Sequence, residues 1–155
     1  MNTDAGNGFV SVPMGEKEYR WLEKGLRGLG FFSQLDMKAL AGILPYISFV
    51  EYARGQAVCR EGDEGDGFYL IYQGGVEVRK AGWDKLVAQL GSGEFFGEMA
   101  LLFGQPRTAT VRTLRNTRLF WLQARDFRKM LRRNPSVTRT IRRIAEERRK
   151  ELAQH

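Results

Sequence analysis

The sequence predicts an α+β domain: an antiparallel β-roll or jelly roll with N-terminal helices, one short helix within the roll and two C-terminal helices. Seven short apolar runs between residues 46 and 123 are separated by Gly- and Asp-rich turns, at the spacing of about 8–12 residues typical of such rolls. Apolar residues recur at helical spacing before and after this region. With 155 residues, 43% of them hydrophobic, the chain has the size and composition of one folded domain.

The region before the roll divides into a lead and a helical part. Residues 1–14 show no periodicity and are expected to form a disordered lead. Residues 15–45 are expected to hold two N-terminal helices. The first covers about residues 16–29, and the second begins at Ser33 and ends at Pro45.

The roll itself is expected to span residues 46–123. Its predicted strands are the runs 47–52, 56–60, 67–72, 75–80, 85–90, 109–114 and 118–123. Between the fifth and sixth runs, residues 98–103 lie between Gly97 and Gly104 and can form one or two helical turns. A helix inside a β-roll departs from the local pattern, and such departures are expected at functional sites.

Residues 124–155 are expected to form two helices that act as a lid. The first is the segment 124–133, and Asn134 followed by Pro135 is an N-cap and first-turn pair that begins the second. The second helix runs to about Leu152. Its apolar stripe is interrupted by Arg148 and consists of Val137, Ile141, Ile144 and Leu152.

The composition excludes several classes of chemistry. Cys59 is the single cysteine and His155 the single histidine, so an internal disulfide, a zinc site, haem ligation by His and a Ser-His or Cys-His catalytic pair are not expected. We therefore expect no metal, no cofactor and no catalytic residues. No apolar run approaches the roughly 20 residues that span a bilayer, and the N-terminus lacks the pattern of a signal peptide. A reducing, cytoplasmic location is expected.

The positive charge of the chain is concentrated at the C-terminal end. Residues 112–155 carry 14 Lys/Arg and 4 Asp/Glu, whereas residues 1–111 carry 11 and 14. This basic end could contact nucleic acid or anionic lipid. Three glutamates, Glu146, Glu147 and Glu151, alternate with the last arginines, which is typical of a solvated, paired helix face. No nucleic-acid partner is therefore expected.

The segment around residues 97–107 has the features of an anion site. Gly97 allows close approach of the backbone, and the following turn presents free amides from Glu98, Met99 and Ala100. Arg107 can add a bidentate clamp for phosphate or carboxylate. The carboxylate of Glu98 fits beside an anion if it accepts hydrogen bonds from ligand hydroxyls, as in a nucleotide ribose. The alternative is an ordinary ion pair between Glu98 and Arg107 that fixes a loop.

The same segment resembles the phosphate-binding cassette of cyclic nucleotide-binding domains, with the pattern F-G-E-x-A-L, a short gap, then P-R-x-A-x-V. The chain has Phe-Gly-Glu-Met-Ala-Leu at 96–101 and Pro-Arg-Thr-Ala-Thr-Val at 106–111. Segments 58–63, 65–66, 68–71 and 75–78 are also similar to the family. The resemblance covers about residues 30–150. Within this family, the chain resembles the cytosolic domain of bacterial cyclic-nucleotide-modulated potassium channels and the sensor domain of catabolite activator proteins.

The resemblance implies a role for each matching residue. Arg107 would bind the cyclic phosphate, together with the amides of Met99, Ala100 and Thr108. Glu98 and the backbone of Gly97 would hold the ribose 2′-hydroxyl. The base would lie among three side chains whose alternative role is simple core packing, namely Cys59, Val78 and Val87.

Thr108 and Arg148 bear on the base of the nucleotide. The hydroxyl of Thr108 could accept from a guanine amine, but no second guanine-specific group is evident, so cAMP is preferred and cGMP is the alternative. Arg148 lies in a Glu-Arg-Arg ending similar to that of the channel domains, which implies a guanidinium that caps the base. Its alternative role is to extend into solvent at a frayed helix end.

The expected function is that of an intracellular cyclic nucleotide sensor that signals by moving its C-terminal helices. The ligand would favour docking of the last helices over the base, and an unidentified protein effector would detect the change. A phosphodiesterase is disfavoured because metal-binding histidines are lacking. The alternative is a cyclic-nucleotide-dependent transcriptional regulator that lacks, or is separated from, its DNA-reading domain.

Overall fold

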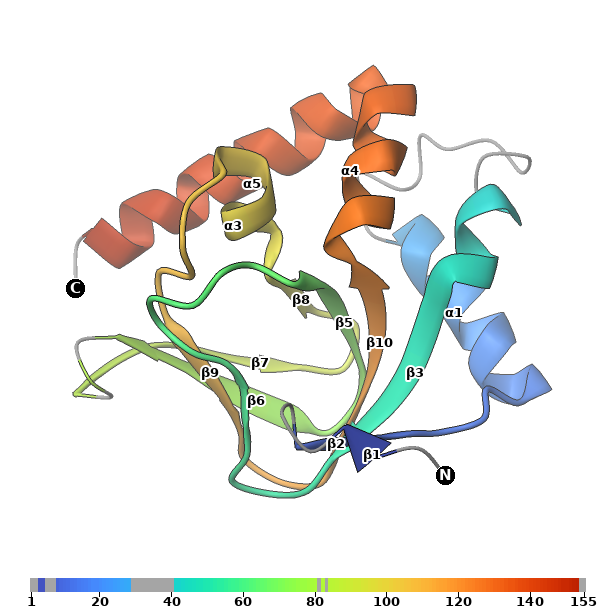
Figure 1. Cartoon of the computed structure of the whole chain (residues 1–155), viewed down its shortest axis with the longest axis horizontal. Coiled ribbons are helices and arrows are strands. Elements are labelled where there is room, and N and C mark those ends of the chain that lie inside the picture. The colour runs from blue at the N-terminus through green and yellow to red at the C-terminus, as the bar shows by residue number, and fades with distance from the viewer. Residues whose placement is uncertain (1–2, 5–7, 29–40, 81, 83, 154–155) are drawn as a thin grey trace.

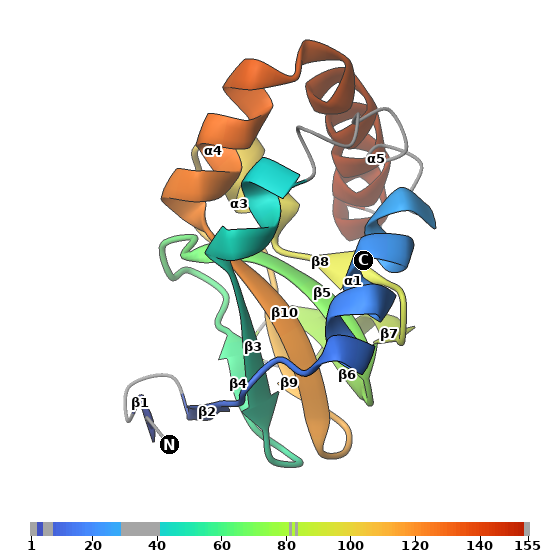
Figure 2. The same cartoon turned by 90° about the vertical axis from the view of Figure 1, so that its right-hand side faces the viewer.

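Two antiparallel sheets face each other, and helices cover one of them (Figure 1 and Figure 2). The computed structural model describes residues 3–4, 8–28, 41–80, 82 and 84–153. Within these residues the first sheet has the strand order β1 (Thr3–Asp4), β2 (Phe9–Ser11), β3 (Ile47–Tyr52), β10 (Thr117–Gln123), β5 (Gly67–Gln73) and β8 (Phe95–Phe96). The second has the order β4 (Ala57–Cys59), β9 (Thr110–Thr113), β6 (Gly75–Lys80) and β7 (Lys85–Gly91). The predicted α+β roll is confirmed.

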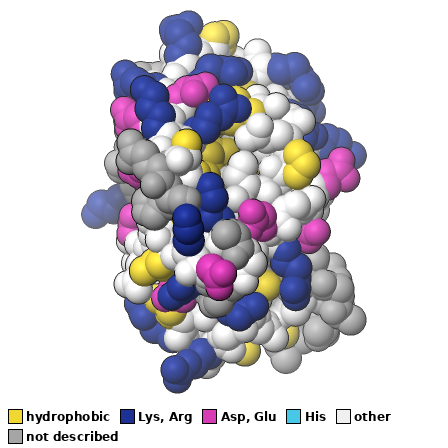
Figure 3. All heavy atoms as spheres, turned by 90° about the vertical axis from the view of Figure 1, so that its left-hand side faces the viewer, with side chains coloured by type: hydrophobic (Ala, Val, Ile, Leu, Met, Phe, Trp, Pro, Cys, Tyr) yellow, Lys and Arg dark blue, Asp and Glu magenta, His cyan; other side chains and the backbone are white. Residues whose placement is uncertain are grey.

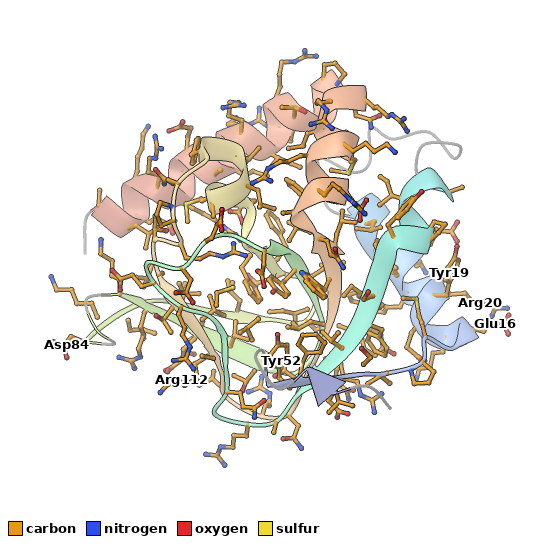
Figure 4. The ribbon with its side chains drawn as sticks, in the orientation of Figure 1. Glu16, Tyr19, Arg20, Tyr52, Asp84 and Arg112 are labelled. Carbon is orange, nitrogen blue, oxygen red and sulfur yellow. The ribbon has the colours of Figure 1, made fainter. Side chains whose placement is uncertain are left out.

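The first sheet separates two hydrophobic cores. Successive side chains of a strand point to opposite faces, so in β5 Phe68 and Leu70 pack toward the helices while Tyr69 and Ile71 pack toward the second sheet. Strand β5 is paired on both sides, by β10 and β8. This burial on both faces explains why its sequence is a continuous apolar run rather than an alternating one. Between the sheets, Tyr52 points into the roll (Figure 4) and is almost fully buried.

The helices lie on the outer face of the first sheet. They are α1 (Glu16–Gly28), the 3-10 helix η2 (Leu44–Tyr46), α4 (Ala124–Arg133) and α5 (Pro135–Ala153). Each buries an apolar stripe in the core beneath it; the stripe of α5 contributes Val137 and Ile141. The opposite face of α1 is polar, and Glu16 and Arg20 form an ion pair there (Figure 4).

Asn134 forms the corner between α4 and α5. The amide of Thr138 donates to the Asn134 carbonyl at 3.1 Å, which is the first hydrogen bond of α5. The Asn134 side chain points backward and donates from Nδ2 to the carbonyl of Met130 at 2.8 Å. Asn134 therefore begins α5 as expected, but its side chain closes the end of α4 instead of capping α5.

The N-terminal lead differs from the expectation. Residues 9–11 are not disordered, because β2 pairs with β3 and Phe9 is buried against the rings of Tyr52 and Trp121 at centroid distances of 5.7 and 5.6 Å. The mostly apolar run at residues 9–12 is too short to show a clear periodicity, and the partners of Phe9 are distant in sequence. The predicted start of a second helix at Ser33 lies outside the described residues; residues 41–43 are helical. Strand β8 was not predicted.

Candidate functional site

The short helix α3 (Glu98–Phe103) occupies the predicted segment 98–103 and packs against α5 (Figure 1). Its N-cap is Gly97, with φ of 97°, and no side chain caps the helix. A Cβ atom at Gly97 would lie 2.7 Å from the carbonyl oxygen of Gly67 and 3.0 Å from Nη1 of Arg107. Glycine is therefore required at this position both by its backbone conformation and by the close approach of its neighbours.

Arg107 is buried behind α3. Nη1 donates to the Gly97 carbonyl at 2.7 Å, and Nη2 donates to Asp66 Oδ1 at 2.8 Å and to the Gly67 carbonyl at 3.0 Å. Burial acts to lower the pKa of Arg107, but the influence of Cys59 and the hydrogen bond and charge of Asp66 outweigh it, so this pKa lies above its ordinary value. The guanidinium is therefore charged. Three of its five N–H donors are used by these described partners, which leaves two for a ligand.

Asp66 holds the guanidinium in place and had no predicted role. Its carboxylate accepts from Arg107 and also from the hydroxyl of Tyr69, at 3.1 and 3.2 Å. Because the Asp66 side chain is 45% exposed and Arg107 is 5% exposed, the pair lies at the boundary between solvent and core. The guanidinium is consequently fixed in one orientation by Asp66, by Gly67 at the start of β5 and by Gly97.

Glu98 is completely buried and pairs with Arg148 of α5. Arg148 Nη1 donates to Glu98 Oε1 at 2.8 Å, and the guanidinium carbon lies 4.4 Å from the centroid of the Phe95 ring. The second carboxylate oxygen, Oε2, is buried and has no hydrogen-bond partner among the described residues. The alternative of an ion pair between Glu98 and Arg107 is not observed, and Arg148 does not extend into solvent, since its side chain is 25% exposed.

These groups surround one cavity of about 340 Å³ between the second sheet, α3 and α5. That volume is within the range of small-molecule sites. All ten residues predicted for the site line it: Cys59, Val78, Val87, Gly97, Glu98, Met99, Ala100, Arg107, Thr108 and Arg148. The structure thus brings together residues that lie up to 89 positions apart in the sequence.

Part of the cavity wall is apolar and is formed by Cys59, Val78 and Val87. Val78 packs against the inner core and also borders the cavity, whereas Val87 lies outside both core clusters. Cys59 belongs to the inner core, and burial raises the pKa of its thiol to about 12. Cys59 and Val78 therefore both pack in the inner core and line the cavity. The hydroxyl of Thr108, half-buried at the cavity wall, makes no hydrogen bond to a residue in the described ranges.

Helix α5 lines the cavity with Ile144 and Leu152, which were not among the predicted site residues, as well as with Arg148. Ile144 and Leu152 share the face of Arg148, four positions before and after it, and both border the cavity. Lys80 of β6 donates from Nζ to the carbonyl of Leu152 at 2.6 Å and so ties the end of the helix to the second sheet. Helical periodicity was sufficient to place Ile144 and Leu152 beside Arg148; the remaining unpredicted lining residues gave no comparable signal, and they are Ala88, Leu90, Glu94, Phe96, Ala109, Val111, Glu147 and Glu151.

The described part of the chain contains neither a candidate membrane span nor a candidate metal centre. None of its helices has the length and apolar character needed to cross a membrane. Within the same residues, no cluster of three or more His, Cys, Asp or Glu could hold a metal ion.

The chain is similar to regulatory proteins and channels that respond to cyclic nucleotides. The family model described as "Cyclic nucleotide-binding domain" matches residues 49–134. A cyclic nucleotide-gated potassium channel of Rhizobium etli is 40% identical over 118 residues, which are 76% of this chain and 32% of the channel. The cAMP-dependent protein kinase regulatory subunit of Mycosarcoma maydis is 41% identical over 91 residues, 57% of this chain and 17% of that protein.

A solved structure shows the same fold. The regulatory domain of Toxoplasma gondii PKA with cAMP superposes with a TM-score of 0.75 and 29% identity, covering 82% of this chain and 49% of the other. The chain spans about a third or less of the curated relatives. Because the family model matches more than half of the chain, the chain belongs to the cyclic nucleotide-binding domain family, whose members are regulatory and not catalytic.

Proposed function

We propose that the cavity binds cAMP, with cGMP as the weaker ligand, and that α5 reports its occupancy. The observation that carries this proposal is the unpartnered, buried oxygen Oε2 of Glu98. A buried acceptor without a partner is costly, and native structures rarely tolerate one. A ribose 2′-hydroxyl is a donor of the right kind. Arg107 donates a hydrogen bond to the carbonyl of Gly97, the residue directly before Glu98. A guanidinium that can bind a phosphate therefore lies close to the Glu98 carboxylate.

The cyclic phosphate would lie against Arg107. Its two remaining donors and its fixed charge supply charge-assisted hydrogen bonds to the exocyclic oxygens. The amides of Met99, Ala100 and Thr108 would complete this shell. The ion pair with Arg148 balances the charge of Glu98, which reduces its repulsion of a nearby phosphate.

Arg148 is better placed to position Glu98 than to cap the base. Its guanidinium lies on the Phe95 ring and bonds to Oε1, which orients the carboxylate so that Oε2 remains available. The base would instead lie among Cys59, Val78 and Val87, covered by Ile144 and Leu152 of α5. This differs from the role that the family resemblance implied.

The apolar lining of the base end supports cAMP over cGMP. Guanine carries more exocyclic polar groups in need of partners, and the Thr108 hydroxyl is one candidate partner. The regulatory domain from Toxoplasma gondii carries cAMP, which agrees with this preference.

Signalling would follow from the position of α5. Its residues Ile144, Arg148 and Leu152 line the cavity, so a bound nucleotide favours the docked helix over alternatives. Backbone amides from Val137 to Leu152 should gain hydrogen-exchange protection on addition of cAMP, and more than those of the β5 and β10 strands. Equal exchange with and without saturating nucleotide would contradict the role of the helix but not the binding site. The effector would be an intracellular protein segment that contacts α5.

The direct test of binding is a calorimetric titration of the chain with cAMP and, separately, with cGMP. We expect saturable binding of both and a lower Kd for cAMP. The variant Arg107→Lys keeps a charge but loses the fork of donors, so it should bind at least about tenfold more weakly. An Arg60→Lys variant, altered at an exposed arginine outside the cavity, is the matched control. Absence of saturable binding, or identical affinity in Arg107→Lys, would overturn the proposal.

A further inference from the structure

Helix α4 and the first half of α5 carry a dense positive surface, which we call the basic face. Between residues 124 and 145 the only acidic residue is Asp126. In Figure 4 nitrogen-tipped side chains project outward from these helices, whereas Figure 3, which faces the end of α5, shows Lys and Arg side chains interspersed with Asp and Glu. The basic face consists of eight exposed residues: Arg125, Arg128, Lys129, Arg132, Arg133, Arg139, Arg142 and Arg143.

None of these eight cations forms an ion pair with a described residue. The paired face expected from the sequence is found only further along α5, where Arg149 lies 3.8 Å from Glu146 and Arg148 pairs with Glu98. The expectation of a paired face rested on Glu146, Glu147 and Glu151, and it does not extend to the basic face, which is exposed but unpaired within the described residues. Its charges repel one another without compensation from the described part of the chain.

Helix stability does not explain this concentration of charge. Cations stabilise the last turn of a helix through the macrodipole, which accounts for Arg132 and Arg133 at the end of α4. Arg139, Arg142 and Arg143 lie in the interior of α5, well before its last turn, where the macrodipole gives no such benefit. They also make no contact with the nucleotide cavity.

The chemistry of the basic face selects the class of partner. Protein interfaces are centred on buried aromatic or aliphatic anchors, but the large exposed apolar residues of the described chain are Tyr19, Tyr46 and Leu86, and none lies on α4 or α5. Single-stranded nucleic acid is held by exposed aromatic rings, which are absent from these two helices. An anionic bilayer requires only a broad display of cations on one side of the molecule.

The arrangement of the helices also fits a bilayer. Both views show α4 and α5 as the outermost layer, on the side away from the strand turns of the roll (Figure 1 and Figure 2). The cations project from this layer rather than into a groove that could follow a duplex. The rest of the chain before α4, residues 1–123, carries 14 Lys/Arg and 14 Asp/Glu, so the net positive charge lies on the two helices. This asymmetry would orient the molecule with α4 and α5 toward a negative surface.

We propose that the basic face docks the domain on an anionic phospholipid surface. The attraction is electrostatic, so it depends on lipid charge and weakens with salt. Each Lys or Arg near such a surface increases affinity by about fivefold. Removal of three charges should therefore reduce binding by about 100-fold.

The test is sedimentation of the full chain with vesicles of phosphatidylcholine alone or of phosphatidylcholine mixed with phosphatidylserine. We compare the wild type with the triple variant Arg139→Gln, Arg142→Gln, Arg143→Gln. The matched control is Lys17→Gln, Lys24→Gln, Arg54→Gln, which removes the same charge from exposed positions outside the basic face. Unfolding curves and cAMP titration verify that each variant is folded.

We expect the wild type and the control variant to bind only the phosphatidylserine vesicles at low salt and to dissociate at high salt. The basic-face variant should bind about 100-fold more weakly. The proposal is overturned if the wild type does not bind phosphatidylserine vesicles at low salt, or if the two triple variants lose equal affinity. It is also overturned if the wild type binds duplex DNA more tightly than phosphatidylserine vesicles at equal phosphate concentration and equal salt.

Discussion

The contact between Glu98 and the ribose can be isolated by a double cycle that changes one partner on each side. The protein change is Glu98→Gln, and the ligand change is from cAMP to 2′-deoxy-cAMP. In the wild type, Oε2 would accept a charge-assisted bond worth about 1.5–3 kcal/mol, whereas a neutral bond contributes about 0.5–1.5 kcal/mol. The glutamine variant should therefore bind cAMP about 5- to 30-fold more weakly.

The deoxy ligand removes the same contact from the other side. It should bind the wild type about 10-fold more weakly or worse, since it leaves Oε2 buried without a partner. In Glu98→Gln the further loss with the deoxy ligand should be much smaller, because the charge-assisted bond is already absent. The interaction energy should thus be about 1 kcal/mol or more.

Calorimetry of all four combinations gives this interaction energy. Glu94→Gln is the control: Glu94 borders the same cavity, is exposed, and accepts from the Gly91 amide, so its variant should show the full deoxy penalty. If the two losses add within error for Glu98→Gln, Glu98 does not contact the 2′-hydroxyl and the ribose assignment is wrong.

Three further results are expected. Arg107→Ala should weaken binding by about 10- to 1,000-fold. It should also lower the free energy of unfolding, measured in urea, by about 2–4 kcal/mol, since three buried or half-buried hydrogen bonds are lost; unchanged stability would refute the burial argument. Arg148→Ala should lower the free energy of unfolding by about 1.5–2 kcal/mol, because it leaves Glu98 buried without its cation. Arg149→Ala removes an exposed ion pair and a contact with the Phe103 ring at 3.9 Å, and it should lower this free energy by about 1 kcal/mol or less; similar losses in both would contradict the coupling. Burial raises the pKa of the Cys59 thiol from 9.0 to about 12, so the neutral thiol contributes its full stabilisation below pH 9 and less above it. The free energy of unfolding of the wild type should therefore fall, relative to that of Cys59→Ala, by about 1.4 kcal/mol per pH unit above about pH 9. Parallel pH profiles of the two proteins would show that the thiol is not buried.

Local patterns were sufficient to predict most elements of this fold. Strand β3, strand β6 and helices α3 and α4 have the predicted boundaries, because their apolar periodicity and the flanking turn residues point to the same structure. Strand β2 was missed because Phe9 is held by rings from β3 and β10, which contribute no pattern to the lead itself. The local strand propensity of a segment carries no information about its pairing with strands that are distant in the sequence.

The site was predicted by its residue types, but not by its contacts. Gly97, Glu98 and Arg107 follow from a local motif, whereas the burial of Arg107 depends on acceptors about 40 positions away, at Asp66 and Gly67. The bond from Arg148 to Glu98 spans 50 positions. For this reason the sequence alone did not predict that Arg107 is buried and bonded to Asp66 and Gly67, or that Arg148 is paired with Glu98.

The most direct test of the binding site is a crystal structure of the chain with cAMP. The account predicts the cyclic phosphate within hydrogen-bonding distance of the free donors of Arg107, and the 2′-hydroxyl on Oε2 of Glu98. The base should contact Val78, Val87 and Leu152, with Arg148 still bonded to Oε1. A nucleotide bound outside this cavity, or one whose phosphate lies away from Arg107, would contradict it.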